Sequence, residues 1–218
     1  MTRGRTLLAW VAVLASLLLG ACTSGSASTG SSASSTGSEL NDRSTSGKYA
    51  GFGLDPAQPR PNFVLTDTSG QQYSFAQLTA GRPTFLYFGY THCPDVCPTT
   101  MADIGQALLA VPPDVRAKTL VVFVTTDPAE DTGPVIASWL KAFSIPNYTG
   151  FVGLTGSQAA INAAQAAAKV PIATDEGKTH SAQVFLYGLD DYAHVAYVQS
   201  NNETDQMKHD LPLVAAGK

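Results

Sequence analysis

Two cysteines in the stretch YTHCPDVCP, residues 90–98, are the side chains of this sequence best suited to chemistry. Cys93 and Cys97 could form a structural disulfide, act as a redox couple, or hold a metal ion as two thiolates. A disulfide would close a very short loop and add little stability, because the gain from a cross-link grows with loop length. Redox work and metal binding are the stronger alternatives, and they are compatible, since a metal-binding dithiol must stay reduced.

The spacing of the two cysteines favours a shared metal ion over a disulfide. Thioredoxin-type redox couples have two intervening residues, whereas three residues separate Cys93 from Cys97. On a helix, positions four apart share one face with β-carbons about 5 to 6 Å apart, whereas a disulfide prefers about 3.5 to 4.5 Å. Two thiolates on one tetrahedral metal lie about 4 Å apart, and such soft ligands select copper(I) or zinc.

Apolar patterns around the cysteines predict an α/β domain with a thioredoxin-like fold. A nearly continuous apolar run at 83–89 indicates a buried strand that ends at the cysteines, and helical spacing follows over 98–110. The order strand, helix, strand, helix, antiparallel pair and helix is that of this fold, with an N-terminal β-hairpin and a helical insertion added. The other predicted elements are a hairpin of two short strands over 63–75, strands 118–126, 183–188 and 194–199, and helices 134–143, 156–169 and 203–211.

This order places the cysteines where a strand ends and a helix begins. The positive end of the helix dipole then faces the thiols and lowers their pKa. A thiolate is the reactive form in disulfide exchange and the ligand form in metal binding, so the position by itself leaves both roles open.

The N-terminus predicts export and a lipid anchor. Two arginines precede an apolar run at 7–19, and small residues then lead to Cys22, which is the pattern of a signal peptide over residues 1–21. Residues 19–22 resemble the bacterial lipobox, so we expect Cys22 to be lipidated and to hold the protein at the outer face of the bacterial cytoplasmic membrane. The alternative is an ordinary signal peptide with an incidental cysteine.

Composition divides the rest of the chain into a tether and one domain. Residues 22–47 are rich in Ser, Thr and Gly and cannot bury enough apolar surface to fold, whereas residues 48–218 have the length of a single domain. The formal net charge is −4 and no basic cluster follows the signal peptide, which argues against nucleic-acid binding and against attachment to acidic lipids through charge.

Three separated motifs together resemble the Sco/SenC family of copper-binding assembly proteins. They are FGYTHCPDVCPTT at 88–100, TDPAEDT at 126–132, and a histidine, His180, shortly before an apolar strand. The resemblance runs from about residue 57 to 214. It implies a membrane-anchored thioredoxin-like protein that assists assembly of the dinuclear copper site of cytochrome c oxidase by delivering copper, by reducing the oxidase's cysteines, or both.

The resemblance also implies a set of metal ligands. Cys93 and Cys97 match the thiolates of the family and His180 matches its imidazole ligand, for one copper ion per domain as Cu(I), Cu(II) or both. The implied partners are an upstream copper donor and the oxidase subunit that carries the dinuclear copper site, and we expect a monomer. Independently, the loop that enters the strand after His180 should face the cysteines in a thioredoxin-like sheet.

Other polar side chains are weaker candidates. Asp127 follows a central strand, where it could orient a ligand or steer the copper donor. His92 adjoins Cys93, but its side chain should diverge from the metal, which favours tuning of a thiol pKa or partner recognition. Met101 fits the apolar face of a helix better than a ligand role. A solvated loop explains Glu130 and Asp131 at least as well as function does, and the expected surface histidines are His194 and His209.

We therefore predict a lipid-anchored extracytoplasmic copper chaperone and not, in the first place, an enzyme. The main alternative is a thiol-disulfide reductase that keeps the oxidase's copper-site cysteines reduced. A peroxide-reducing enzyme of the same fold is a weaker alternative, because such enzymes usually place an arginine near the attacking cysteine, and none lies between Arg82 and Arg116.

Overall fold

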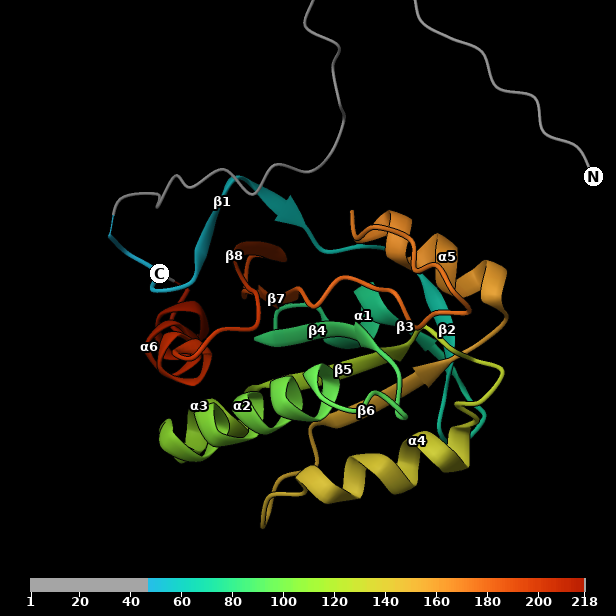
Figure 1. The fold of residues 1–218 in the computed structure, drawn as a ribbon. Coiled ribbons are helices and arrows are strands. Elements are labelled where there is room, and N and C mark those ends of the chain that lie inside the picture. Colours follow the sequence, from blue (N-terminus) through green and yellow to red (C-terminus); the bar gives the residue numbers. More distant parts are fainter. Residues whose placement is uncertain (1–46, 218) are drawn as a thin grey trace, which may run out of the picture. The chain divides into compact units, whose positions relative to one another are not determined.

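A mixed sheet of eight strands organises the residues that the computed structural model describes, 47–217 (Figure 1). The predicted signal peptide and Cys22 lie outside these residues. The strands are β1 (Phe52–Pro59), β2 (Val64–Asp67), β3 (Gln72–Ser74), β4 (Thr84–Gly89), β5 (Leu120–Thr125), β6 (Phe151–Thr155), β7 (Val184–Tyr187) and β8 (Tyr192–Tyr197). The helices are α1 (Phe75–Thr79), α2 (Val96–Ala110), α3 (Pro113–Lys118), α4 (Gly133–Leu140), the 3-10 helix η1 (Lys141–Phe143), α5 (Gln158–Ala167) and α6 (Glu203–Ala215).

The sheet has the order β1-β8-β7-β4-β5-β6-β2-β3. Its centre is parallel, since β5 pairs in parallel with both β4 and β6, and the flanking pairs are antiparallel. Parallel neighbours must be joined by crossovers, and α2 and α4 supply them. The carboxyl ends of β4 and β5 consequently lie side by side, each followed by a loop.

Side chains that alternate along the central strands point to opposite faces of the sheet and divide the core into two layers. On β4, Phe85 and Tyr87 pack with α2, α4 and α6, whereas Leu86 and Phe88 pack with α1 and α5 on the other face. Figure 1 shows α2 and α4 on one side of the sheet and α5 on the other. Because successive side chains of a strand point to opposite faces, a strand covered on both faces must be apolar throughout, as the run at 84–89 is.

The thioredoxin-like α/β fold predicted from the sequence is confirmed, and all ten predicted elements are present with shifted ends. Four elements were not predicted: β1, β6, α1 and α3. The predicted helical insertion is larger than a helix, because β6 precedes α5 and adds a further parallel strand to the sheet. None of the helices in residues 47–217 is long and apolar enough to cross a bilayer.

Candidate metal centre

The two cysteines lie between the end of β4 and the first turn of α2. Cys97 is in that turn and is fully buried, whereas Cys93 is in the turn before the helix and is partly exposed; both are free thiols. The distance expected for positions four apart on a helix does not apply to this pair, because Cys93 precedes the helix and Asp95, the residue before the helix, has φ −146° and ψ −70°. The sulfur of Cys93 instead accepts the backbone N–H of Cys97 at 3.4 Å, as an acceptor at a helix N-terminus does.

His180 lies beside Cys97, although 83 positions separate the two residues in the chain. Its Nε2 is 3.5 Å from the Cys97 Sγ, and its Nδ1 is 3.0 Å from the Ser181 carbonyl oxygen. A carbonyl can only accept, so Nδ1 carries the proton and the neutral imidazole directs the Nε2 lone pair at the sulfur. The ring edges of Tyr90 and Tyr87 pack against the imidazole, with centroids 5.6 Å and 6.4 Å away.

The segment before His180 is attached to the end of β5 through Thr126. The Thr126 hydroxyl donates to the Gly177 carbonyl at 2.7 Å and lies 3.2 Å from the Gly89 carbonyl at the end of β4. Gly177 has φ +89°, and a β-carbon there would lie 2.0 Å from the Thr126 carbonyl oxygen, so only glycine fits. Sequence reasoning missed both Thr126 and Gly177; the glycine in the polar loop before His180 was the available signal.

The two thiols are electrostatically unequal. Burial disfavours ionisation of Cys93, but hydrogen bonds from the backbone N–H groups of Cys97 and Asp95 outweigh it and lower the pKa of Cys93. Burial raises the pKa of Cys97 to about 12. Burial also lowers the pKa of His180, which keeps the imidazole neutral and able to bind a metal. Cys93 is therefore the accessible thiol that ionises more readily, and Cys97 would ionise only where a cation compensated its charge.

The donor atoms fit a soft metal ion. With bond lengths near 2.3 Å to sulfur and 2.0 Å to nitrogen, as for zinc, a tetrahedral metal holds the two donors about 3.5 Å apart, and Cys97 and His180 show this separation. Within residues 47–217, no three His, Cys, Asp or Glu side chains yet converge as a finished metal site. Cys97 and His180 thus form a pair of donors at the separation that a metal ion requires, and a three-ligand site would require Cys93 to move towards them.

Asp131 is part of the structure around the cysteines and not of a solvated loop. The side chain is fully buried and accepts hydrogen bonds from Thr91 and Thr125, so the solvated-loop interpretation of this residue is wrong. Glu130 is exposed, as expected for a loop. The His92 imidazole is largely exposed and contacts Thr91 at 3.1 Å through its Nδ1. Met101 is core, as predicted.

Asp127 lines a polar cavity next to the segment that carries His180. The cavity has a volume of about 530 Å³ and is also lined by Glu130, Glu176 and Lys178. The carboxylate of Asp127 is almost fully buried and accepts a long hydrogen bond from the Glu130 N–H at 3.4 Å. Asp127 thus lies beside the His180 segment, and a role in orienting a ligand stays a prediction.

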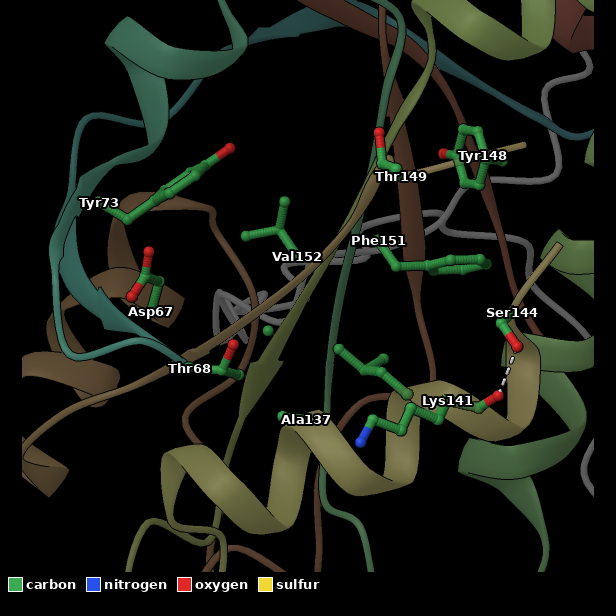
Figure 2. A pocket seen from close by; sticks show the side chains of 12 residues that line it. Asp67, Thr68, Tyr73, Ala137, Lys141, Ser144, Tyr148, Thr149, Phe151 and Val152 are labelled. Atoms are coloured by element: carbon green, nitrogen blue, oxygen red, sulfur yellow. Dashed lines mark hydrogen bonds between the residues drawn. The ribbon is translucent and has the colours of Figure 1, made fainter. Parts of the chain in front are cut away.

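A second cavity, of about 400 Å³, lies between α4, β6 and the turn of the β2–β3 hairpin. Figure 2 shows the rings of Tyr73 and Phe151 and the Lys141 side chain around it. Among the predicted site residues, none lines this cavity. The chemistry predicted from the sequence therefore lies at the carboxyl ends of β4 and β5, not in this hollow.

The fold and this site define a thioredoxin-like protein with a thiol pair and a histidine at the carboxyl edge of its central strands. The SCO1/SenC family model matches residues 54–215, and the chain belongs to this family. It is 29% identical over 160 residues to a candidate copper-binding protein of Stutzerimonas stutzeri, covering 71% of this chain and 76% of that protein.

Two solved structures are similar over most of the described residues. Copper-bound ScoI of Bradyrhizobium japonicum has a TM-score of 0.59 and 29% identity, and the match covers 72% of this chain and 99% of ScoI. Apo Sco1 of Thermus thermophilus has a TM-score of 0.63 and 29% identity, with 76% and 96% covered. Copper binding is thus a property found within the family.

Proposed function

We propose that this protein binds one copper ion through Cys93, Cys97 and His180 and delivers it to the dinuclear copper site of cytochrome c oxidase. The observation that carries the proposal is the 3.5 Å approach of the His180 Nε2 to the Cys97 Sγ, with the imidazole proton held on the other nitrogen. Two thiolates and one neutral imidazole form a soft ligand set suited to copper, in the Cu(I) state, the Cu(II) state or both.

The three ligands differ in how readily they can release the metal. Cys93 is partly exposed and precedes the helix, whereas Cys97 is buried in the core. His180 lies in a separate segment held by Thr126. A partner's ligand can therefore replace Cys93 or His180 first while Cys97 still holds the ion, and stepwise exchange of this kind avoids a free metal ion.

The remaining parts of the proposal concern place and partners. Lipidation of Cys22 would attach the domain through the tether 22–47 to the outer face of the cytoplasmic membrane, where membrane-bound oxidase subunits expose their extracytoplasmic domains. An upstream copper donor and the oxidase subunit carrying the dinuclear copper site are the two partners, and the protein acts as a monomer.

A second function, thiol-disulfide reduction of the oxidase's cysteines, is supported by the inequality of the thiols. An accessible thiol with a lowered pKa next to a buried one with a raised pKa is the arrangement of an attacking and a resolving cysteine. The two functions differ in their need for His180, because disulfide exchange uses the sulfurs alone.

Copper titration of the reduced Cys22→Ser protein tests the proposal, since that substitution removes only the thiol of the predicted anchor. We expect His180→Ala to weaken copper binding at least tenfold, about 1.4 kcal/mol or more. His209→Ala, which removes a half-exposed imidazole on α6, is the matched control and should leave the affinity unchanged. Equal affinity of the His180→Ala variant and the control would refute the copper-binding proposal and leave the reductase function.

A further inference from the structure

Asp131 is fully buried, and both oxygens of its carboxylate accept hydrogen bonds from neighbouring segments. Its Oδ2 accepts the backbone N–H of Thr91 at 2.9 Å and the Thr125 hydroxyl at 2.7 Å, and its Oδ1 accepts the Thr91 hydroxyl at 2.5 Å. Thr125 is the last residue of β5, and Thr91 lies two residues before Cys93. The carboxylate therefore ties the start of the cysteine loop to the end of the neighbouring strand.

The backbone of Asp131 is itself held in place. Its N–H donates to the Asp127 carbonyl at 2.9 Å, and its carbonyl accepts the Thr155 hydroxyl of β6 at 3.1 Å. A buried carboxylate with several donors forms strong, short hydrogen bonds that are costly to break. Asp131 thus transfers the rigidity of the parallel strands to the loop that carries Cys93.

The same contacts orient His92. The Thr91 hydroxyl hydrogen is donated to Asp131, so the Thr91 oxygen can only accept from His92 Nδ1, which lies 3.1 Å away. The Nδ1 is also 3.6 Å from the Asp131 Oδ1, while the imidazole is largely exposed. The hydrogen bonds from His92 through Thr91 to Asp131 therefore hold the imidazole beside Asp131, at the start of the cysteine loop.

We propose that Asp131 is the positioning residue of the cysteine loop: through Thr91 it fixes Cys93 relative to Cys97 and His180 and so sets how tightly the site binds a soft metal ion. The two halves of the site are then held separately, the cysteine loop by Asp131 and the His180 segment by Thr126. Only the part of this inference that concerns metal affinity rests on the proposed function, since the ordering of the loop is a property of the metal-free protein.

Two variants and one control test the inference in the Cys22→Ser protein. Asp131→Asn keeps the shape of the side chain but places an amide where two donors meet, and Thr91→Val removes only the hydroxyl while leaving the carboxylate. Thr119→Val is the matched control, because it removes a threonine hydroxyl that donates to the Val115 carbonyl at 2.8 Å, at the opposite end of β5 from Thr125. If the asparagine variant does not fold, the valine variant at position 91 carries the test.

Two readouts need no metal. Amide hydrogen exchange of the loop 91–96 in the reduced protein should rise at least tenfold in both variants, while amides of β5 change less than threefold. Because a loosened loop lets the sulfurs approach, the dithiol–disulfide equilibrium should shift at least tenfold towards the disulfide, about 30 mV for this two-electron couple. The control should match the parent protein in both measurements.

The third readout is copper affinity, which should fall at least tenfold in both variants. If both variants exchange and oxidise like the Thr119→Val control, the inference about Asp131 is overturned. If the loop loosens as expected but the parent protein itself binds no copper, the positioning role stands and the proposed function is what fails.

Discussion

Substitution of Glu203 by glutamine should make the protein markedly more stable at alkaline pH and change little at acidic pH. Glu203 begins α6, is 1% exposed, and neither of its carboxylate oxygens has a hydrogen-bond partner within the described residues. Burial and, to a lesser degree, repulsion from Asp103 on α2 raise the pKa of Glu203 to about 7, against an ordinary value of 4.5. An unpartnered buried carboxylate is costly when it is ionised and tolerable when it is protonated.

The sign and size of the effect follow from this difference in pKa. Below pH 4.5 the carboxyl is protonated in both states and has no pH-dependent effect. Between pH 4.5 and about 7 the unfolded chain ionises while the folded protein keeps its proton, so unfolding becomes easier; above about pH 7 both are ionised and the loss levels off. A rise from 4.5 to about 7 corresponds to a loss of about 3 kcal/mol of stability above pH 8, of which roughly 2.5 kcal/mol develops between pH 5 and 8.5.

Urea denaturation of the Cys22→Ser protein and its Glu203→Gln variant at pH 5 and pH 8.5 measures this pH-dependent loss of stability. Relative to the parent protein, the free energy of unfolding of the variant should be higher at pH 8.5 than at pH 5 by about 2 kcal/mol or more. Glu130→Gln, which neutralises an exposed carboxylate, should show no such growth. A difference that is the same at both pH values would refute the assignment of a raised pKa to this buried carboxyl.

Two further predictions concern the cysteines. A β-carbon at Gly89 would lie 2.9 Å from the Cys97 Sγ and 3.1 Å from the Tyr87 ring. Gly89→Ala should therefore destabilise the fold by about 1 to 3 kcal/mol and weaken copper binding at least tenfold. Gly105→Ala is the control and should have neither effect, because nothing lies within 4 Å of a β-carbon there. Because the pKa of Cys93 is lowered and that of Cys97 is about 12, iodoacetamide should modify Cys93 first between pH 7 and 9, as peptide mass spectrometry would show, and equal rates would contradict this ordering.

Most of the fold could be predicted from the sequence because its central strands and helices have strong apolar patterns. The strands that were missed lack them. β1 contains two prolines and an aspartate and pairs irregularly with β8 at the edge of the sheet, and β6 is a short strand with Gly153 at its centre and a glycine on either side. Both are held by pairing with neighbours that are distant in the chain, and local propensity does not record such pairing.

The sequence alone determined the soft donors of the site: two closely spaced thiols, and a histidine before an apolar strand. Only the tertiary structure decided where the imidazole and the sulfur, 83 positions apart, lie relative to one another: β7 pairs antiparallel with β4, so the segment entering β7 lies at the end of β4. It also showed that Cys93 lies outside the helix and that Asp131 is buried. Hydrogen bonds between residues remote in sequence set these features, and residue types cannot reveal which donors a carboxylate will meet in the folded chain.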